Sequence, residues 1–485
     1  MDELFDTEDM TGLAAHVADG RVTAVELLDA AIARCDRVNG HLNAVVLRFD
    51  DVARRKIAEG LPEGPFRGVP FLLKDLGAEA VDYPSHNGSR LLHHTTYDRD
   101  SAIYERIAAA GLVTFGRTAS PEGGVGPVTE AAVYGGPTCN PWDTSRTPGG
   151  SSGGSGAAVA SGIVPGAHGS DGGGSVRIPA SNCGLFGFKP TRARLPDGPY
   201  AGEGWAGMAT DGFLTRSVRD QAALLDACAG PDLGAPYVAP RLQGTFTEAT
   251  RTALPQRRVA LLTTSLTGAE LAPACVEAAR EAARTLEGLG HEIVEIAPPP
   301  ADTQGMMLAW CKIVACGTAL WIDKTVAARG RPLEEGEVER IALSARDYAR
   351  GLSGADYLDA VGKIHSYGRQ MARVFLDFDI LLTPTMAEPP AKVGRFSHDR
   401  DDYLAYRTAS DGVFAYSPFT AAFNATGQPA ASVPLHWTED GLPVGIHLAA
   451  RFGADLDLMS LCADLERACP WAQRRPAVWA GRTDP

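Results

Sequence analysis

The feature that most constrains this chain is the segment RTPGGSSGGSGAAVASGIVPGAHGSDGGGSVRIPA, residues 146–180, in which about half the residues are glycine or serine. Such composition is typical of a flexible linker, a phosphate-binding loop or an active-site loop. The apolar stretch AAVASGIVPGAH inside it disfavours a linker. A phosphate loop needs a lysine directly after its glycines, and GGSSGG is followed by Ser155 and Gly156. The remaining interpretation is catalytic.

Composition excludes several classes of function. The 485 residues carry a formal charge of −14 and no basic arm, so nucleic acid is not expected as a partner. The N-terminus, MDELFDTEDM, lacks the apolar core of a signal peptide. No run reaches roughly 18 uninterrupted apolar residues, which predicts no spanning helix and no membrane association. Nine scattered cysteines favour reduced thiols in the cytoplasm.

Helices and strands are expected to alternate along the chain. Thr23 and Glu26 form a capping-box pattern before a helix whose apolar positions include Val25 and Leu28. A buried strand is predicted within residues 68–77. Further strands and helices are predicted at 101–111 (helix), 112–118 (strand), 258–264 (strand), 273–290 (helix), 291–297 (strand), 379–386 (strand), 441–450 (strand) and 455–469 (helix). This alternation favours an α/β layered fold.

The serines of the glycine-rich segment need a base if they are to act as nucleophiles. Glycine permits the backbone conformations in which several N–H groups converge on one oxygen, so the clusters around Ser151 and Ser175 suit an oxyanion hole. His168 is the only histidine in the segment, and a loop-orienting or core role is favoured for it. Lys74 ends the apolar run FLL, and burial would lower its pKa and allow a neutral lysine to act as the base.

With these residues in view, the segment resembles the signature of the amidase signature family, whose Ser–cis-Ser–Lys hydrolases cleave C–N bonds of amides. The resemblance is carried by GGSSGG (149–154), Asp171, Gly173, SVR (175–177) and Pro179. It extends outward to the stretches GVPFLLKDL, GLFGFKPT, FNATGQPAASVP and GLPVGIHL. It therefore covers most of the chain, and residues 240–415 match least.

The family resemblance implies the fold and the roles of individual residues. It implies a single domain over residues 1–485, built on a large mixed central sheet with helices on both sides, although length alone suggests two to four domains. It implies Ser175 as the nucleophile, Lys74 as the general base and Ser151 as a bridging serine that follows a cis peptide bond. The backbone N–H groups of the expected oxyanion hole belong to Gly172, Gly173, Gly174 and Ser175.

Residues near these positions are expected to support the site. Asp171 and Arg177 flank the nucleophile and are expected to hold its loop as a buried pair. Ser152, next to the bridging serine, is expected either to tune the site or only to pack against its neighbours. Asp75 follows Lys74 in a strand, so the two side chains should point to opposite faces without pairing. Cys183 is expected to be a small buried residue.

Some positions depart from the family pattern or lie in its variable part. Arg117 and Ala119 stand where many members have Lys and Asn, and Gly172 stands where a larger residue is common. Residues 240–415 are expected to form a substrate-specificity region. Its aromatic residues either line an apolar pocket or belong to the core, with the core favoured for most, as it is for the cysteines: Trp310, Trp321, Tyr403, Tyr406, Phe414, Tyr416, Cys311 and Cys316.

Within the family, the chain most resembles bacterial hydrolases of the 6-aminohexanoate cyclic-dimer type, through AHGSDGGGSVRIPASNCG, KPTRAR, GRPLEEGEVE and CPWAQRRP. The implied substrate is a small amide, with cyclic or linear oligoamides as candidates. Carbamate, ester and aryl-amide hydrolysis remain alternatives, as do an amidotransferase A-type subunit and an inactive binding protein. No cofactor is expected, and no metal, because neither HExxH nor a Cys/His ligand spacing occurs. The oligomeric state is left open, with a homodimer as one alternative.

Overall fold

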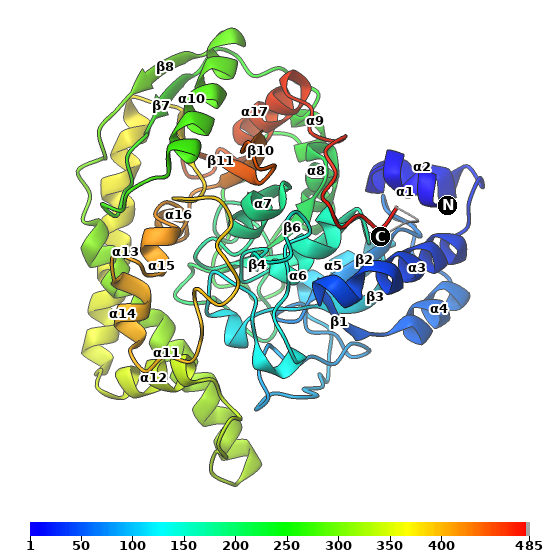
Figure 1. Ribbon diagram of the computed structural model, residues 1–485, viewed down its shortest axis with the longest axis horizontal. Coiled ribbons are helices and arrows are strands. Elements are labelled where there is room, and N and C mark those ends of the chain that lie inside the picture. Colours follow the sequence, from blue (N-terminus) through cyan, green and yellow to red (C-terminus); the bar gives the residue numbers. More distant parts are fainter. Residues whose placement is uncertain (482–485) are drawn as a thin grey trace.

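The computed structural model describes residues 1–481, and their strands join in one sheet of eleven (Figure 1). The strand order is β1-β3-β2-β4-β6-β5-β10-β11-β9-β7-β8. The strands are β1 (Val45–Arg48), β2 (Pro70–Lys74), β3 (Val113–Thr118), β4 (Gly166–Asp171), β5 (Phe186–Lys189), β6 (Thr210–Thr215), β7 (Arg258–Leu261), β8 (Glu292–Glu295), β9 (Ile380–Pro384), β10 (Ala430–Trp437) and β11 (Pro443–Ala450). Parallel and antiparallel pairs both occur, so the sheet is mixed, as predicted.

Helices precede, connect and follow these strands. They are α1 (Asp2–Thr7), α2 (Met10–Ala18), α3 (Ala24–Leu42), α4 (Asp50–Glu59), α5 (Ala102–Ala109), α6 (Gly153–Ala160), α7 (Arg177–Cys183), α8 (Val218–Cys228), α9 (Phe246–Ala249), α10 (Pro273–Gly288), α11 (Thr303–Arg329), α12 (Arg340–Arg350), α13 (Gly354–Ala372), α14 (Tyr403–Thr408), α15 (Val413–Tyr416), α16 (Thr420–Thr426) and α17 (Asp455–Ala468). Short 3-10 turns lie at Glu122–Gly124, Ala132–Tyr134 and Arg373–Leu376.

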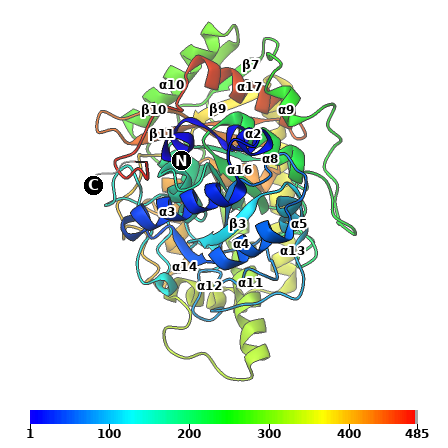
Figure 2. The ribbon, with the colours of Figure 1, turned by 90° about the vertical axis from the view of Figure 1, so that its right-hand side faces the viewer.

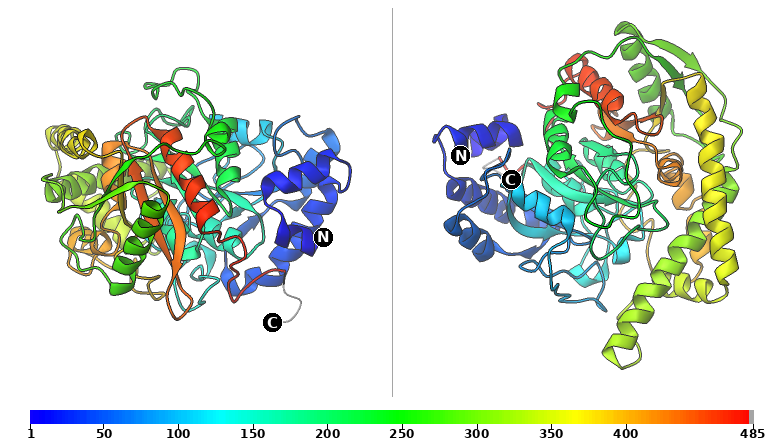
Figure 3. Two further views of the ribbon diagram at one scale, coloured as in Figure 1. Left: turned by 90° about the horizontal axis from the view of Figure 1, so that it is seen from above. Right: turned by 180° about the vertical axis from the view of Figure 1, so that it is seen from behind.

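Both faces of the central strands are covered. Every residue of β2, β3, β9 and β11 is buried, although successive side chains of a strand point to opposite faces. Figure 2 shows α3 and α4 lying over β3, and Figure 3 shows helices on either side of the sheet. The α/β fold with a covered mixed sheet, predicted from the family resemblance, is confirmed.

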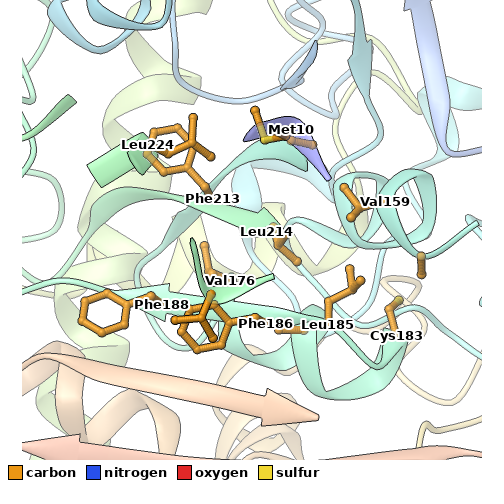
Figure 4. Close-up of a cluster of buried hydrophobic side chains, with 14 of the residues drawn as sticks. Met10, Val159, Val176, Cys183, Leu185, Phe186, Phe188, Phe213, Leu214 and Leu224 are labelled. Carbon is orange, nitrogen blue, oxygen red and sulfur yellow. The ribbon is translucent and has the colours of Figure 1, made fainter. Parts of the chain in front are cut away.

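The apolar core is continuous through the middle of the sheet. Figure 4 shows Phe186 and Phe188 of β5 packed beside Phe213 and Leu214 of β6, with Val176 of the neighbouring loop between them. A second cluster of buried apolar residues is supplied largely by α11 to α16. The molecule therefore has one packed region along the strands and another among the later helices.

The predicted elements occur close to where the sequence placed them. The capping box of Thr23 and Glu26 is present at the start of α3. Leu28 of this helix is buried as its spacing predicts, but Val25 is 40% exposed. The predicted strand–helix–strand unit after residue 257 is β7, α10 and β8, and its two strands pair in parallel.

Helix α11 bears on the prediction that no helix spans a membrane. Its 27 residues include an 18-residue window of mean hydropathy 1.5, enough by length and composition alone to cross a bilayer. Half of that window is buried inside the protein, where α11 packs against α12 and α13. This is the pattern of a core helix in a globular protein, so the composition of α11 is weak evidence for a membrane.

The glycine-rich segment is part of the packed interior, so the linker interpretation is wrong. It forms α6, β4, the following loop and α7, and residues 147–169 are all buried. A β-carbon on Gly150 would lie 2.5 Å from the carbonyl oxygen of Val128, and one on Gly154 would lie 2.3 Å from the backbone nitrogen of Ala119. Glycine is needed at these two positions because other backbone segments pass so close.

Candidate active site

The site lies where two neighbouring strands end. β2 and β4 are adjacent and parallel, so their carboxyl ends reach the same edge of the sheet. Lys74 is the last residue of β2, and Asp171 is the last residue of β4. Ligand sites of α/β proteins commonly lie beyond the carboxyl ends of such strands.

Lys74 is fully buried and bonded to two serine hydroxyls. Its Nζ lies 2.7 Å from Oγ of Ser151 and 2.9 Å from Oγ of Ser170. Burial lowers the pKa of Lys74 to about 7, and the charges of Asp211 and Asp171 oppose this shift only in part. A large share of Lys74 is therefore neutral at neutral pH and able to accept a proton.

Ser151 follows the cis peptide bond Gly150–Ser151, which confirms the backbone geometry predicted from the sequence. The nearby Ser175 is 9% exposed and borders a pocket. In the described part of the chain, its hydroxyl makes no hydrogen bond, while its carbonyl accepts from the N–H of Ser152 at 3.2 Å. Lys74 and Ser151 are thus joined directly, and the Ser175 hydroxyl is free to meet a substrate.

The loop after β4 has its carbonyls occupied and most of its N–H groups free. The carbonyls of residues 172–175 accept from Trp310, Thr420, Ile178 and Ser152 respectively. Among the described residues, the N–H groups of Gly172, Gly173 and Ser175 have no partner. That of Gly174 donates to Oδ1 of Asp171 at 2.8 Å, so it differs from the other three expected oxyanion donors.

Asp171 and Arg177 form the buried pair predicted from the sequence. Nε and Nη2 of Arg177 donate to the two carboxylate oxygens at 2.9 and 2.8 Å. Burial alone would raise the pKa of Asp171, but the charge and hydrogen bonds of Arg177, with a bond from Asn424, lower it well below its usual range. Arg177 also lies 3.0 Å from Nε2 of His447. Residues of α7 (Arg177), α16 (Asn424) and β11 (His447) therefore hold the loop in place.

Ser152 and His168 hold the backbone around the site. The hydroxyl of Ser152 accepts from the N–H of Ser170 and donates to its carbonyl, both at 3.2 Å. His168 is buried, accepts from the N–H of Lys74 at 3.3 Å and lies 3.0 Å from Asp211. The orienting role predicted for His168 therefore has a structural basis.

Arg117, a position where the resemblance implies a different residue, holds the end of β2 by hydrogen bonds to the backbone. It is fully buried and donates to the carbonyl of Lys74 at 2.8 Å, and to those of Tyr83 and Ala78. Asp75 turns away from Lys74 as predicted, and accepts from the N–H of His86 at 3.0 Å. Ala119, a second position where the resemblance implies a different residue, is buried.

A pocket with aromatic walls opens beside Ser175. Its walls include Trp205, Trp310, Phe414 and Arg407, and the rings of Trp205 and Phe414 meet Trp310 edge to face at 5.6 and 5.5 Å. Trp205 occupies the space that a larger residue at position 172 would need, since a β-carbon there would lie 2.5 Å from its ring. The absence of a side chain at Gly172 thus makes room for the ring of Trp205.

The remaining aromatic and cysteine candidates are mostly structural. Tyr403, Tyr406 and Tyr416 are buried in the core, and Trp321 is half-buried on α11. Cys183 and Cys311 are fully buried, and burial raises the pKa of the Cys311 thiol to about 12. Cys316 is half-buried on α11. None of these residues lines the pocket beside Ser175.

One group of side chains has the geometry to hold a metal ion. Among the described residues, ring nitrogens of His86, His93 and His94 lie within 4.8 Å of one another on the loop between β2 and α5. Nδ1 of His86 already accepts from the N–H of His94 at 3.1 Å. The sequence spacing did not single out this cluster, because its histidines match no recognised ligand motif.

Several participants were missed from the sequence, and Trp205 of the pocket wall is one of them. Ser170 bonds to Lys74, Asn424 bonds to Asp171, and Arg407 lies in the pocket wall. Only Ser170 had a local signal, because it stands at the end of β4 beside Asp171. Asn424 and Arg407 come from segments more than 200 residues away.

Comparison with known proteins relates the whole chain to amide hydrolases. A family model described as Amidase matches residues 26–459. The chain is 36% identical, over 97% of both sequences, to a 6-aminohexanoate-cyclic-dimer hydrolase of Paenarthrobacter ureafaciens. It is 36% identical to a putative amidase, AmiC, of Mycobacterium tuberculosis, over 98% of this chain and 97% of that protein.

Solved structures agree with this relationship. A 6-aminohexanoate cyclic dimer hydrolase complexed with substrate superposes with a TM-score of 0.92 at 36% identity, covering 98% of this chain and 99% of the other. A bacterial aryl acylamidase of the amidase signature enzymes superposes with a TM-score of 0.87 at 28% identity, covering 99% of each chain.

Proposed function

Because this chain belongs to the amidase signature family, we propose that it cleaves the C–N bond of a small amide through an acyl-enzyme on Ser175. It is an amidohydrolase that acts on non-peptide amide bonds. The observation that carries the mechanism is the 2.7 Å hydrogen bond between Ser151 and Lys74, a buried lysine whose pKa is about 7. The proposed catalytic residues are Lys74, Ser151 and Ser175.

In the proposed first step, neutral Lys74 accepts a proton from Ser151 while Ser151 accepts the proton of Ser175. The Ser175 oxygen attacks the carbonyl carbon and forms a tetrahedral intermediate. The proton then returns through Ser151 to the departing amine nitrogen, which leaves as a neutral amine. Water, activated through the same two groups, hydrolyses the Ser175 ester and releases the carboxylic acid.

The negative charge of the intermediate needs donors already in place. We assign this role to the N–H groups of Gly172, Gly173 and Ser175, whose lack of partners supports it. Gly174 was expected among them, but its N–H is held by Asp171, and we propose that it stiffens the loop instead. Removing one such donor costs roughly 3–4 kcal/mol of transition-state stabilisation in a well-studied protease.

Two substrate classes are supported by specific observations. The relatives named for 6-aminohexanoate cyclic dimer favour oligoamides, cyclic or linear. The aromatic walls of the pocket and the likeness to an aryl acylamidase favour aryl amides as a second candidate. We propose that residues 240–415 set this choice, since they supply Trp310, Arg407 and Phe414.

The proposal also includes where the enzyme works. All nine cysteines are free, and six of them are buried. We therefore place the enzyme in the reducing cytoplasm, as the sequence predicted.

The test is a hydrolysis screen of wild-type protein and Ser175→Ala over cyclic amides, linear amides, anilides, carbamates, esters and glutamine. We expect amide hydrolysis that the variant lowers by about 10⁴-fold or more, as loss of a serine nucleophile does elsewhere. A fluorophosphonate should label Ser175 in the wild type only. Labelling that persists in Ser175→Ala, or glutamine as the sole substrate, would contradict the proposal. The melting temperature of the variant serves as the control for folding.

A further inference from the structure

Arg407 is a buried cation in the wall of the pocket that holds Ser175. It lies in α14, is 3% exposed and borders the same cavity as Gly173 and Trp310. Arginine is rarely buried without a partner of opposite charge, because removing a cation from water costs several kcal/mol. Its surroundings therefore need an explanation.

Aromatic rings, rather than carboxylates, surround this guanidinium. Its central carbon lies 5.0 Å from the ring centre of Trp310, 5.2 Å from that of Tyr406 and 5.7 Å from that of Tyr403. Such contacts attract a cation, but they do not satisfy its N–H groups. Within residues 1–481, Arg407 forms no ion pair, and its Nε and Nη2 are buried without a hydrogen-bond partner.

The two unpartnered nitrogens are the ones that bind a carboxylate elsewhere in this protein. Arg177 uses Nε and Nη2 to hold both oxygens of Asp171. This parallel pair of donors matches the spacing of carboxylate oxygens, which makes the interaction bidentate and specific. Arg407 has the same pair without a carboxylate from the protein. Arg407 therefore brings a positive charge without a protein counter-charge to the wall of this pocket.

We propose that the pocket beside Ser175 is a carboxylate subsite, in which Arg407 binds the carboxylate of an anionic amide substrate. This inference rests on the proposed function and narrows its substrate class. The rings of Trp205, Trp310 and Phe414 enclose the apolar part of the substrate, and Arg407 pairs with its charged end. A linear oligoamide of an ω-amino acid ends in a carboxylate and a cyclic one does not, so the linear class is favoured.

Matched substrate pairs test the subsite and show which side of the scissile bond carries the charge. Succinanilic acid and butyranilide differ by a carboxylate on the acyl side. N-acetyl-6-aminohexanoate and N-hexylacetamide differ by one on the amine side. We expect wild-type kcat/KM to favour the charged member of at least one pair by about 10- to 100-fold, the range for hydrogen bonds to charged groups, mainly through KM. Equal kcat/KM values within both pairs would overturn the proposal.

Substitution of Arg407 identifies the group responsible. In Arg407→Met, the ratio of kcat/KM between the charged and the neutral member of a pair should fall to near unity, and taking this ratio within each pair cancels any loss common to both members. Arg407→Lys should retain part of the preference, because it keeps the charge but loses the paired donors. Arg395→Met is the matched control, since Arg395 also lies over aromatic rings, Phe396 and Tyr416, but is outside the pocket. A preference that survives intact in Arg407→Met would reject Arg407 as its source.

Binding separates failure of the subsite from failure of the proposed function. Calorimetric titration of Ser175→Ala with the same pairs needs no turnover. Tighter binding of a charged member by about tenfold or more supports the subsite even if no amide is hydrolysed, an outcome that would reject only the proposed function. Equal binding of the charged and neutral members would reject the subsite even if both are hydrolysed. The wild-type comparisons stand by themselves if Arg407→Met does not fold.

Discussion

Buried polar groups have different surroundings in two regions of the molecule. One region is the strand ends that carry the candidate catalytic residues, and the other is the helical layer formed by α11 to α16. At the strand ends, Lys74 is bonded to two hydroxyls, and Arg177 is bonded to Asp171 through two nitrogens. In the helical layer, Arg407 and the hydroxyl of Tyr406 are buried with unpartnered polar atoms. One region is fixed by hydrogen bonds, and the other is shaped by aromatic packing.

This difference separates two tasks of an enzyme. Groups that transfer protons must keep their positions within a fraction of an ångström, and the hydrogen bonds of Lys74 and of the loop after β4 help to achieve this. In a pocket wall, polar groups without a protein partner can form hydrogen bonds with the substrate instead. Substitutions at the strand ends should therefore slow all substrates alike, whereas substitutions in the helical layer should change which substrate is preferred.

The largest effect in this comparison after loss of Ser175 is expected for Lys74→Ala. Loss of the proposed base should lower kcat/KM by about 10²–10⁴-fold, by the same factor for charged and neutral amides. In the wild type, Lys74 is protonated below its pKa of about 7 and cannot accept a proton. The wild-type rate should therefore fall as pH falls through 7, and rate profiles between pH 5 and 9 measure this. The same acid limb in Lys74→Ala would argue against its role as the base.

Ser151 and Ser152 are adjacent serines with different hydrogen bonds, so they form an internal control. Ser151→Ala removes one of the two hydroxyl partners of Lys74 and should lower the acylation rate by about 10²–10⁴-fold without weakening binding. Ser152→Ala removes bonds to the backbone of Ser170 and should cost about 1 kcal/mol of stability, with a milder loss of rate. Single-turnover kinetics and urea unfolding distinguish the two. Equal rate losses would remove the proposed relay role of Ser151.

The two regions can be compared directly by the effect of replacing Arg177 or Arg407 on the free energy of unfolding. Arg177→Met leaves Asp171 buried without its counter-charge and should lower the free energy of unfolding by about 3–5 kcal/mol. Arg407→Met gives up cation–π contacts and a contact with the Tyr403 hydroxyl, and relieves a charge without an ion-pair partner, so the change should stay below about 2 kcal/mol. Denaturant unfolding of both variants measures the difference. Similar losses would mean that Arg407 has a structural partner of comparable strength.

The smallest effect on activity is expected outside both regions, at the cluster of His86, His93 and His94. Treatment with a chelator should leave activity unchanged, because the proposed mechanism uses no metal and His86, His93 and His94 lie on a separate loop. Activity lost to the chelator and restored by zinc would assign this cluster a role in catalysis.

Local features of the sequence pointed to the catalytic candidates, and the family resemblance implied their roles. Lys74 was found from an apolar run, and Ser151 and Ser175 were found from two glycine clusters. Asp171 and Arg177 are six residues apart, and the pairing expected from that proximity is present. The strand, the turns and the Asp171–Arg177 pair could be predicted because such features depend on neighbouring residues, whose chemistry can be read directly from the chain.

Only the tertiary structure decided which distant residues complete the site. The order of strands in the sheet places Ser170 beside Lys74, and the packing of α14 and α11 places Arg407 against Trp310. Trp205 and Gly172 are 33 positions apart, yet the absent side chain of one makes room for the ring of the other. The positions of these glycine, tryptophan and arginine residues along the sequence do not indicate that they will be in contact. The sequence by itself indicated the proposed proton-transfer residues, and the long-range packing of strands and helices determined the pocket, because those contacts depend on the arrangement of the complete fold.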